Sequence, residues 1–302
     1  MLELIVSDMD GTLLDGTMHI HPRNREAIMH TYQLGIPFIV ATGRNFHEAK
    51  VLLDEAGIRC PIIGLNGAIL FDREGEVEYE IDLDDQVAKE IIHYGLEHGY
   101  YMEAMTSKNV YSNSKHQRLH YIADMIQRMS PELSFEETLS RASQSNEVNS
   151  IEYIDDLTAL IEEEGQHILK LVFIHEKGPQ VLHPIQQELS QRYDNIYITS
   201  SFKSNLEISA KTANKGGAVA KYCQAHGYNP KNIMAIGDNL NDLKMLEMAG
   251  YSFAMANADP AVKEIADYVT GSHNEGGVAD AIYKSLDLSQ TNTQWEKAPY
   301  GD

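Results

Sequence analysis

The sequence predicts an α/β protein built on a doubly wound, Rossmann-like parallel sheet, with a second α/β domain inserted into it. Near both ends of the chain, short continuous apolar runs alternate with helical patterns, which is typical of parallel strands covered on both faces. From Asp84 to residue 208 the pattern changes to short strands among longer helices. The first pattern returns at Lys215, and this interruption indicates an inserted domain.

Three buried strands and two helices are expected before the insertion. Pro22 suits the first turn of the first helix, and Gly35 and Gly57 follow the helices as stop signals. The expected elements are strands at Leu2–Ser7, Ile36–Ala41 and Pro61–Leu65, helices at 22–34 and 45–56, and a hairpin at 69–71 and 77–81.

In the insertion and the second part of the core, most segments show a helix or strand pattern, but two polar stretches do not. The polar stretch 130–149 gives no clear pattern, and the polar segment 287–302 is expected to form a flexible tail. The predicted core is therefore 1–83 with 209–302, around an insertion at 84–208. Expected elements in the insertion are helices near 84–98, 116–129, 155–164 and 179–192, and strands near 100–105, 109–112, 168–174, 195–200 and 205–209. Core helices are expected at 215–227, 242–249, 260–266 and 277–286, and strands at 233–236, 251–255 and 268–270.

Composition excludes several functional classes. The 302 residues carry 24 basic and 45 acidic side chains, a net charge of −21, which argues against sequence-independent binding of nucleic acid. Two cysteines exclude a disulfide scaffold and a cysteine-based zinc site. The N-terminus lacks the features of a signal peptide, and no apolar window is long enough to span a bilayer. We therefore expect a cytoplasmic protein without a membrane partner; its oligomeric state is not specified.

Polar clusters follow four of the predicted strands directly, and a fifth opens a helix. Ligands of such folds bind at the carboxyl ends of the strands, so these segments are expected to converge. Together they supply carboxylates, amides, a hydroxyl and a lysine, which suit phosphoryl chemistry with a hard divalent cation. The clusters are 8–13, 42–45, 66–67, 215–216 and 237–242.

Asp8 and Asp10 lie two residues apart at a strand end, so both can face the same side. This arrangement suits Asp8 as a nucleophile that forms an aspartyl phosphate, and Asp10 as the acid and base that serves the leaving alcohol and then water. The alternative is an ordinary aspartate-rich turn after a strand. Gly11 permits the sharp turn that follows.

Asp238 and Asp242 are predicted metal ligands, with Asn241 between them as a hydrogen-bond donor to phosphate. Asp242 could instead only cap the following helix. Mg²⁺ prefers few carboxylates and retained waters, so Asp8, Asp238 and the backbone carbonyl of Asp10 form a plausible set.

Lys215 would add positive charge beside the phosphate, and Thr42 a hydroxyl donor. Taken alone, Lys215 could be a surface lysine and Thr42 a helix cap.

The motifs DMDGTLL, ATGR, NGA, Lys215-Gly216 and GDNLNDLKML resemble those of the haloacid dehalogenase (HAD) superfamily. The long insertion between the second and third motifs is similar to that of Cof-type phosphatases, which carry a type IIB cap. The resemblance implies Asp8 as nucleophile and Asp10 as acid and base. The implied phosphate-binding residues are Thr42, Gly43, Lys215 and Asn241, and the implied Mg²⁺ site comprises Asp8, Asp10, Asp238 and Asp242.

The resulting hypothesis is a Mg²⁺-dependent phosphatase that hydrolyses a small phosphorylated metabolite, such as a sugar phosphate or similar phosphomonoester, through an aspartyl phosphate. The insertion is expected to act as a lid that excludes water and selects the leaving group. Two alternatives remain: a phosphomutase acting on sugar phosphates, and a non-catalytic regulatory protein on the same scaffold.

Overall fold

The computed structural model describes residues 1–163, 166–200 and 203–296, with side chains up to residue 290. The chain divides into two compact units. One comprises Met1–Glu80 together with the chain from Ala213 onward, and the other comprises Ile81–Thr212. Each unit has its own sheet and its own apolar core.

The first unit is built around an eight-stranded sheet with the order β14-β13-β12-β1-β2-β3-β4-β5. Strands β1 to β3 and β12 to β14 run parallel, and β4 and β5 form the antiparallel hairpin that the sequence predicted. The predicted doubly wound sheet is confirmed. The strands are β1 Leu4–Ser7, β2 Phe38–Ala41, β3 Ile62–Gly64, β4 Ile69–Phe71, β5 Val77–Glu80, β12 Ile233–Gly237, β13 Tyr251–Ala254 and β14 Tyr268–Val269.

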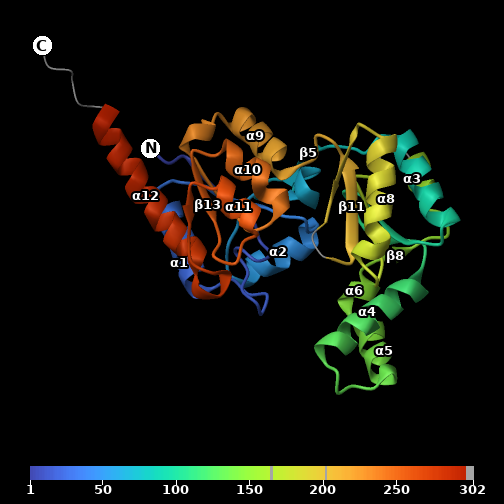
Figure 1. The fold of residues 1–302 in the computed structure, drawn as a ribbon. Coiled ribbons are helices and arrows are strands. Elements are labelled where there is room, and N and C mark those ends of the chain that lie inside the picture. The colour runs from blue at the N-terminus through green and yellow to red at the C-terminus, as the bar shows by residue number, and fades with distance from the viewer. Residues whose placement is uncertain (164–165, 201–202, 297–302) are drawn as a thin grey trace, which may run out of the picture. The chain divides into compact units, whose positions relative to one another are not determined.

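Helices cover both faces of this sheet. Figure 1 shows α1 and α12 packed together on one side, and α9 and α10 packed together on the other. Local signals set their starts: Pro22 opens α1, and the side chains of Asn45 and Asn214 cap α2 and α9. The helices are α1 Pro22–Gln33, α2 Phe46–Glu55, α9 Lys215–His226, α10 Leu243–Met248, α11 Pro260–Ile265 and α12 Gly277–Glu296, with short 3₁₀ helices η1 Leu65–Gly67, η2 Pro230–Asn232, η3 Leu240–Asp242 and η4 His273–Glu275.

The end of α12 corrects the sequence prediction. We predicted that this helix ends at residue 286, but it continues to Glu296. The predicted end rested on the polarity of the segment after residue 286. No glycine or proline occurs between Gly277 and residue 299, so the sequence contains no residue there that would stop the helix. The last six residues of the predicted tail lie outside the described part of the chain.

The second unit contains a six-stranded sheet with the order β10-β11-β9-β6-β7-β8. Helices α3 and α8 pack their apolar residues against one face of it, and α4 and α5 form a separate small core. The strands are β6 Tyr101–Met105, β7 Val110–Ser112, β8 Glu152–Tyr153, β9 Lys170–Ile174, β10 Ile196–Thr199 and β11 Asn205–Ala210. The helices are α3 Asp85–Glu97, α4 Lys115–Met129, α5 Phe135–Gln144, α6 Asn146–Asn149, α7 Ala159–Glu162 and α8 Pro179–Arg192.

The polar stretch without a sequence prediction contains α5 and α6. Its signal was a capping box, in which Ser134 and Glu137 exchange side-chain to backbone bonds at the start of α5.

None of the helices in the described residues has both the length and the apolar character needed to cross a membrane.

Candidate active site

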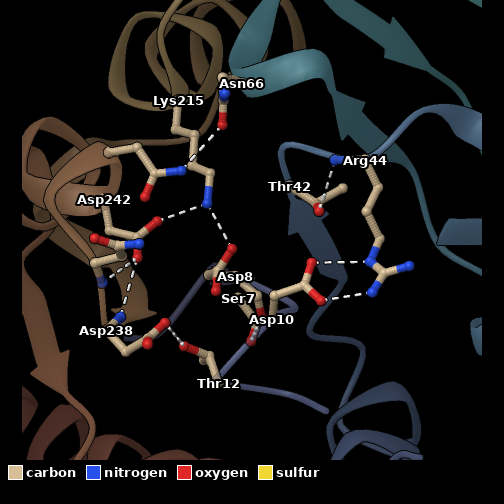
Figure 2. A network of polar contacts seen from close by, with 12 residues as sticks. Ser7, Asp8, Asp10, Thr12, Thr42, Arg44, Asn66, Lys215, Asp238 and Asp242 are labelled. Atoms are coloured by element: carbon tan, nitrogen blue, oxygen red, sulfur yellow. Dashed lines mark hydrogen bonds and ion pairs between the residues drawn. The ribbon is translucent and has the colours of Figure 1, made fainter. Parts of the chain in front are cut away.

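Three neighbouring strands of the core sheet end at the candidate site. The central strand β1 lies between β12 and β2, and all three run in the same direction. Asp8 follows β1, Thr42 follows β2 and Asp238 follows β12. Parallel strands place their carboxyl ends at one edge, and Figure 2 shows these side chains gathered there. The predicted convergence of the motifs is therefore seen in the fold.

Lys215 lies at the centre of a buried ion network. Its Nζ donates to Oδ1 of Asp8 at 2.5 Å and to Oδ1 of Asp242 at 2.7 Å. The lysine is 1% exposed, Asp8 4% and Asp242 0%, so water screens these charges little. Although burial alone would lower it, the charges of Asp242 and Asp8 raise the pKa of Lys215 above its ordinary value. The surface-lysine alternative is thus wrong.

The charge of Asp8 is incompletely compensated. Burial raises the pKa of Asp8 well above its ordinary range, and the charges of Asp242 and Asp238 act in the same direction, against the attraction of Lys215. Burial, together with the charge of Asp242, also raises the pKa of Asp238 to about 6. One buried ammonium therefore faces more negative charge than it neutralises.

Asp242 braces the loop that carries Asp238. Its Oδ2 accepts hydrogen bonds from the backbone N–H groups of Asp238 and Asn239, each at 3.0 Å. Because its Oδ1 accepts from Lys215, both oxygens of Asp242 are engaged within the protein. Gly237 is required beside it, since a Cβ there would lie 2.5 Å from Cγ of Asp242. Asp242 thus does more than cap a helix.

The residues present fit a hard divalent cation. Asp8, Asp238 and Asp242 offer carboxylate oxygens within 4.8 Å of one another, the one such group of three or more acidic, histidine or cysteine side chains in the described residues. The donors are all oxygen, which suits Mg²⁺ better than softer metals. Thr12 donates from Oγ1 to Oδ1 of Asp238 at 3.0 Å and orients it. A cation here would neutralise the excess negative charge.

Asp10 lies apart from this carboxylate cluster. Arg44 holds it with two bonds, Nε to Oδ2 at 2.8 Å and Nη2 to Oδ1 at 2.6 Å. Figure 2 shows the Asp10 carboxylate directed toward Arg44 while Asp8 is directed toward Lys215. Arg44 belongs to the ATGR motif, but the sequence alone assigned it no role. Its position two residues after Thr42 was the available signal.

The predicted phosphate-binding side chains lie around the same strand ends. Thr42 is fully buried, and its Oγ1 accepts a hydrogen bond from the backbone N–H of Arg44 at 3.1 Å, which leaves the hydroxyl hydrogen unused by that bond. It does not cap α2, because Asn45 does. Asn241 donates from Nδ2 to Oδ1 of Asn66 at 3.0 Å. Asn66 is a second residue that the sequence motifs contained without an assigned role.

Comparison with known proteins identifies the family of this site. A model of the haloacid dehalogenase-like hydrolases matches residues 5–282. The chain belongs to this family. The resemblance to Cof-type HAD phosphatases is confirmed, and the enzyme class is that of the HAD phosphomonoesterases.

Individual HAD relatives cover nearly the whole chain. A Bacillus subtilis protein, 5-amino-6-(5-phospho-D-ribitylamino)uracil phosphatase YwtE, is 32% identical over 94% of this chain and 98% of its own length. Pyridoxal phosphate phosphatase YbhA of Escherichia coli is 28% identical over 94% and 98%. The structure of a haloacid dehalogenase-like hydrolase from B. subtilis superposes with a TM-score of 0.79 at 27% identity, covering 93% of this chain and 99% of that one.

Proposed function

We propose that this HAD protein is a Mg²⁺-dependent phosphatase that hydrolyses a small phosphorylated metabolite through an aspartyl phosphate on Asp8. The observation that carries the proposal is the buried Asp8 carboxylate, 2.5 Å from the ammonium of Lys215 and within one cluster with Asp238 and Asp242. A carboxylate at such a position attracts a phosphoryl group only when its negative surroundings are neutralised, so catalysis is expected to require the cation.

In the first step, an oxygen of Asp8 attacks phosphorus and the bond between phosphorus and the leaving alcohol breaks. Lys215 stabilises the charge on the phosphoryl oxygens, because its ammonium is buried where water does not screen it. The hydroxyl of Thr42, the backbone N–H of Gly43 and the amide of Asn241 are proposed to donate further hydrogen bonds to those oxygens.

Asp10 is proposed to act twice, once when the aspartyl phosphate forms and once when water hydrolyses it. It gives a proton to the leaving oxygen, and then takes a proton from the water that attacks phosphorus and releases Asp8. Because Arg44 occupies both Asp10 oxygens through paired hydrogen bonds, it holds the carboxylate in one orientation.

The metal would be held by Asp8, Asp238 and the backbone carbonyl of Asp10, with Asp242 keeping the Asp238 loop in place. When bound, Mg²⁺ supplies positive charge to the phosphoryl oxygens and neutralises the carboxylates. Thr12 would keep Asp238 in a fixed orientation toward it.

The insertion at 84–208 is proposed to act as a lid and to select the leaving group. Support comes from the relatives: YwtE and YbhA are named for different substrates, although each matches this chain over almost all of its length. The substrate proposed here is a sugar phosphate or similar phosphomonoester.

A screen of phosphate esters for released phosphate tests the proposal, run with Mg²⁺ and with a chelator, on the native protein and on Asp8→Asn. Turnover should require both Mg²⁺ and Asp8. Turnover that persists in Asp8→Asn would refute the nucleophile, and turnover that ignores the chelator would refute the metal requirement.

A further inference from the structure

Asn66, in η1 directly after β3, has no role in the proposed reaction, yet its backbone is held in an unfavourable conformation. Its φ is 57° and ψ 28°, and Leu65 before it has a φ of 50°. Two successive non-glycine residues in the left-handed region carry a strain that the surrounding structure must maintain. Asparagine tolerates this region better than most residues. Strain of this kind often accompanies a functional constraint.

The loop that carries Asn66 is tied to two segments of the active site. The N–H of Leu65 donates to the carbonyl of Arg44 at 3.0 Å, and the N–H of Asn66 donates to the carbonyl of Thr42 at 2.9 Å. On its other side, a Cβ on Gly67 would lie 2.5 Å from the carbonyl oxygen of Asn214, which caps the helix opened by Lys215. Asn66 therefore has a fixed position relative to the site.

The side chain of Asn66 accepts a hydrogen bond from Asn241. The distance from Nδ2 of Asn241 to Oδ1 of Asn66 is 3.0 Å, and Figure 2 shows the bond at Asn66. Asn66 is 1% and Asn241 9% exposed, so water competes little for this bond. Gly43 leaves room for it, since a Cβ at that position would come within 3.2 Å of Oδ1 of Asn66.

The other end of the Asn241 amide has no such anchor. Its Oδ1 is buried and finds no hydrogen-bond partner within the residues that the structure describes. A carboxamide anchored at one end only depends on that contact for its orientation. Nδ2 carries two hydrogens, and Asn66 takes one of them, which leaves the second in a defined direction.

We propose that Asn66 is a positioning residue whose side-chain carbonyl orients the Asn241 amide, so that the second N–H of Nδ2 donates to the phosphoryl group. This role rests on the proposed function, in which Asn241 binds phosphate. Asn66 does not touch the substrate and acts through Asn241.

Asn66→Gly separates the hydrogen bond from the backbone strain, because glycine adopts the left-handed conformation without steric cost and lacks the side-chain carbonyl. We expect about a 10-fold lower kcat/KM for a phosphate ester, since a net hydrogen bond of this strength changes an equilibrium by that order. The affinity of the Mg²⁺-loaded enzyme for inorganic phosphate, measured by titration calorimetry, should fall by a similar factor. The melting temperature should stay within a few degrees of the native value.

A double-mutant cycle with Asn241→Ala supplies the control. If Asn66 acts through Asn241, adding Asn66→Gly to Asn241→Ala should change kcat/KM by less than twofold. Independent losses that multiply would overturn the proposal, as would unchanged turnover and phosphate binding in Asn66→Gly. A native protein that hydrolyses no phosphate ester refutes the proposed function, whereas an active native enzyme that is insensitive to Asn66→Gly refutes only the role of Asn66.

Discussion

Replacing Asp238 with asparagine should stabilise the metal-free protein while removing its response to Mg²⁺. The structure raises the pKa of Asp238 from an ordinary 3.8 to about 6, chiefly through burial and through the charge of Asp242. Each pKa unit corresponds to about 1.4 kcal/mol, so the ionised side chain costs on the order of 3 kcal/mol in the folded state. Asparagine keeps the shape and the acceptor for Thr12 but carries no charge.

The pH dependence of this gain has a definite sign. The folded state holds its proton more tightly than the unfolded state, so the cost is absent below about pH 3.8, grows between pH 3.8 and 6, and is complete above pH 6. For a unit of this size, about 3 kcal/mol corresponds to a rise in melting temperature of about 6–12 °C. The gain should therefore be largest at pH 8 and much smaller at pH 4.

Thermal unfolding in the presence of EDTA measures the effect, and repeating it with excess Mg²⁺ should raise the melting temperature of the native protein but not of Asp238→Asn. Glu264→Gln is the matched control, because it removes one negative charge from an exposed position of the same unit. A metal-free Asp238→Asn that melts at or below the native temperature at pH 8 would show that the ionised Asp238 does not destabilise the fold, as would an equal gain in Glu264→Gln.

Substitutions at three further positions test other parts of the network. Lys215→Met should destabilise the protein by about 3–5 kcal/mol in chemical denaturation, because it leaves Asp8 and Asp242 buried without a counter-ion. A native-like free energy of unfolding would contradict the ion network. Gly237→Ala should cost about 1–3 kcal/mol and weaken Mg²⁺ binding, because the added Cβ meets Asp242 at 2.5 Å, and an unchanged metal titration would count against the loop brace. Arg44→Ala should lower kcat about 10- to 100-fold by freeing Asp10, with no rescue by Arg44→Lys, since lysine lacks the paired donors; full activity of the lysine variant would show that orientation is unimportant.

The sequence was sufficient to predict the strands whose residues are buried on both faces of the sheet. Strands such as β1 and β12 are covered on both faces, so they read as continuous apolar runs whose carboxyl ends could be assigned to one edge. The motif residues at those ends, Asp8 and Asp238, therefore came together as expected. Helix boundaries with explicit signals, such as Pro22, were also predictable.

Side-chain pairing across distant loops was not predictable, because it depends on geometry rather than on residue spacing. Nothing in the spacing of Asp10 and Arg44 shows that both oxygens of the acid are engaged by the guanidinium. The contact between Asn66 and Asn241 joins residues 175 positions apart, and it exists because two loops meet at the sheet edge. Helix α5 was not predicted for a different reason: its apolar face is small, so its main sequence signal is the capping box at Ser134 and Glu137.

The aspartyl phosphate on Asp8 can be detected by trapping the phosphorylated enzyme. The native protein is mixed with Mg²⁺ and p-nitrophenyl phosphate, quenched rapidly in acid, digested, and its peptides are analysed by mass spectrometry. We expect one phosphoryl group on the peptide that contains Asp8, and none in the Asp8→Asn protein. Rapid turnover without any phosphorylation of Asp8, or a phosphoryl group on another residue that persists in Asp8→Asn, would contradict it.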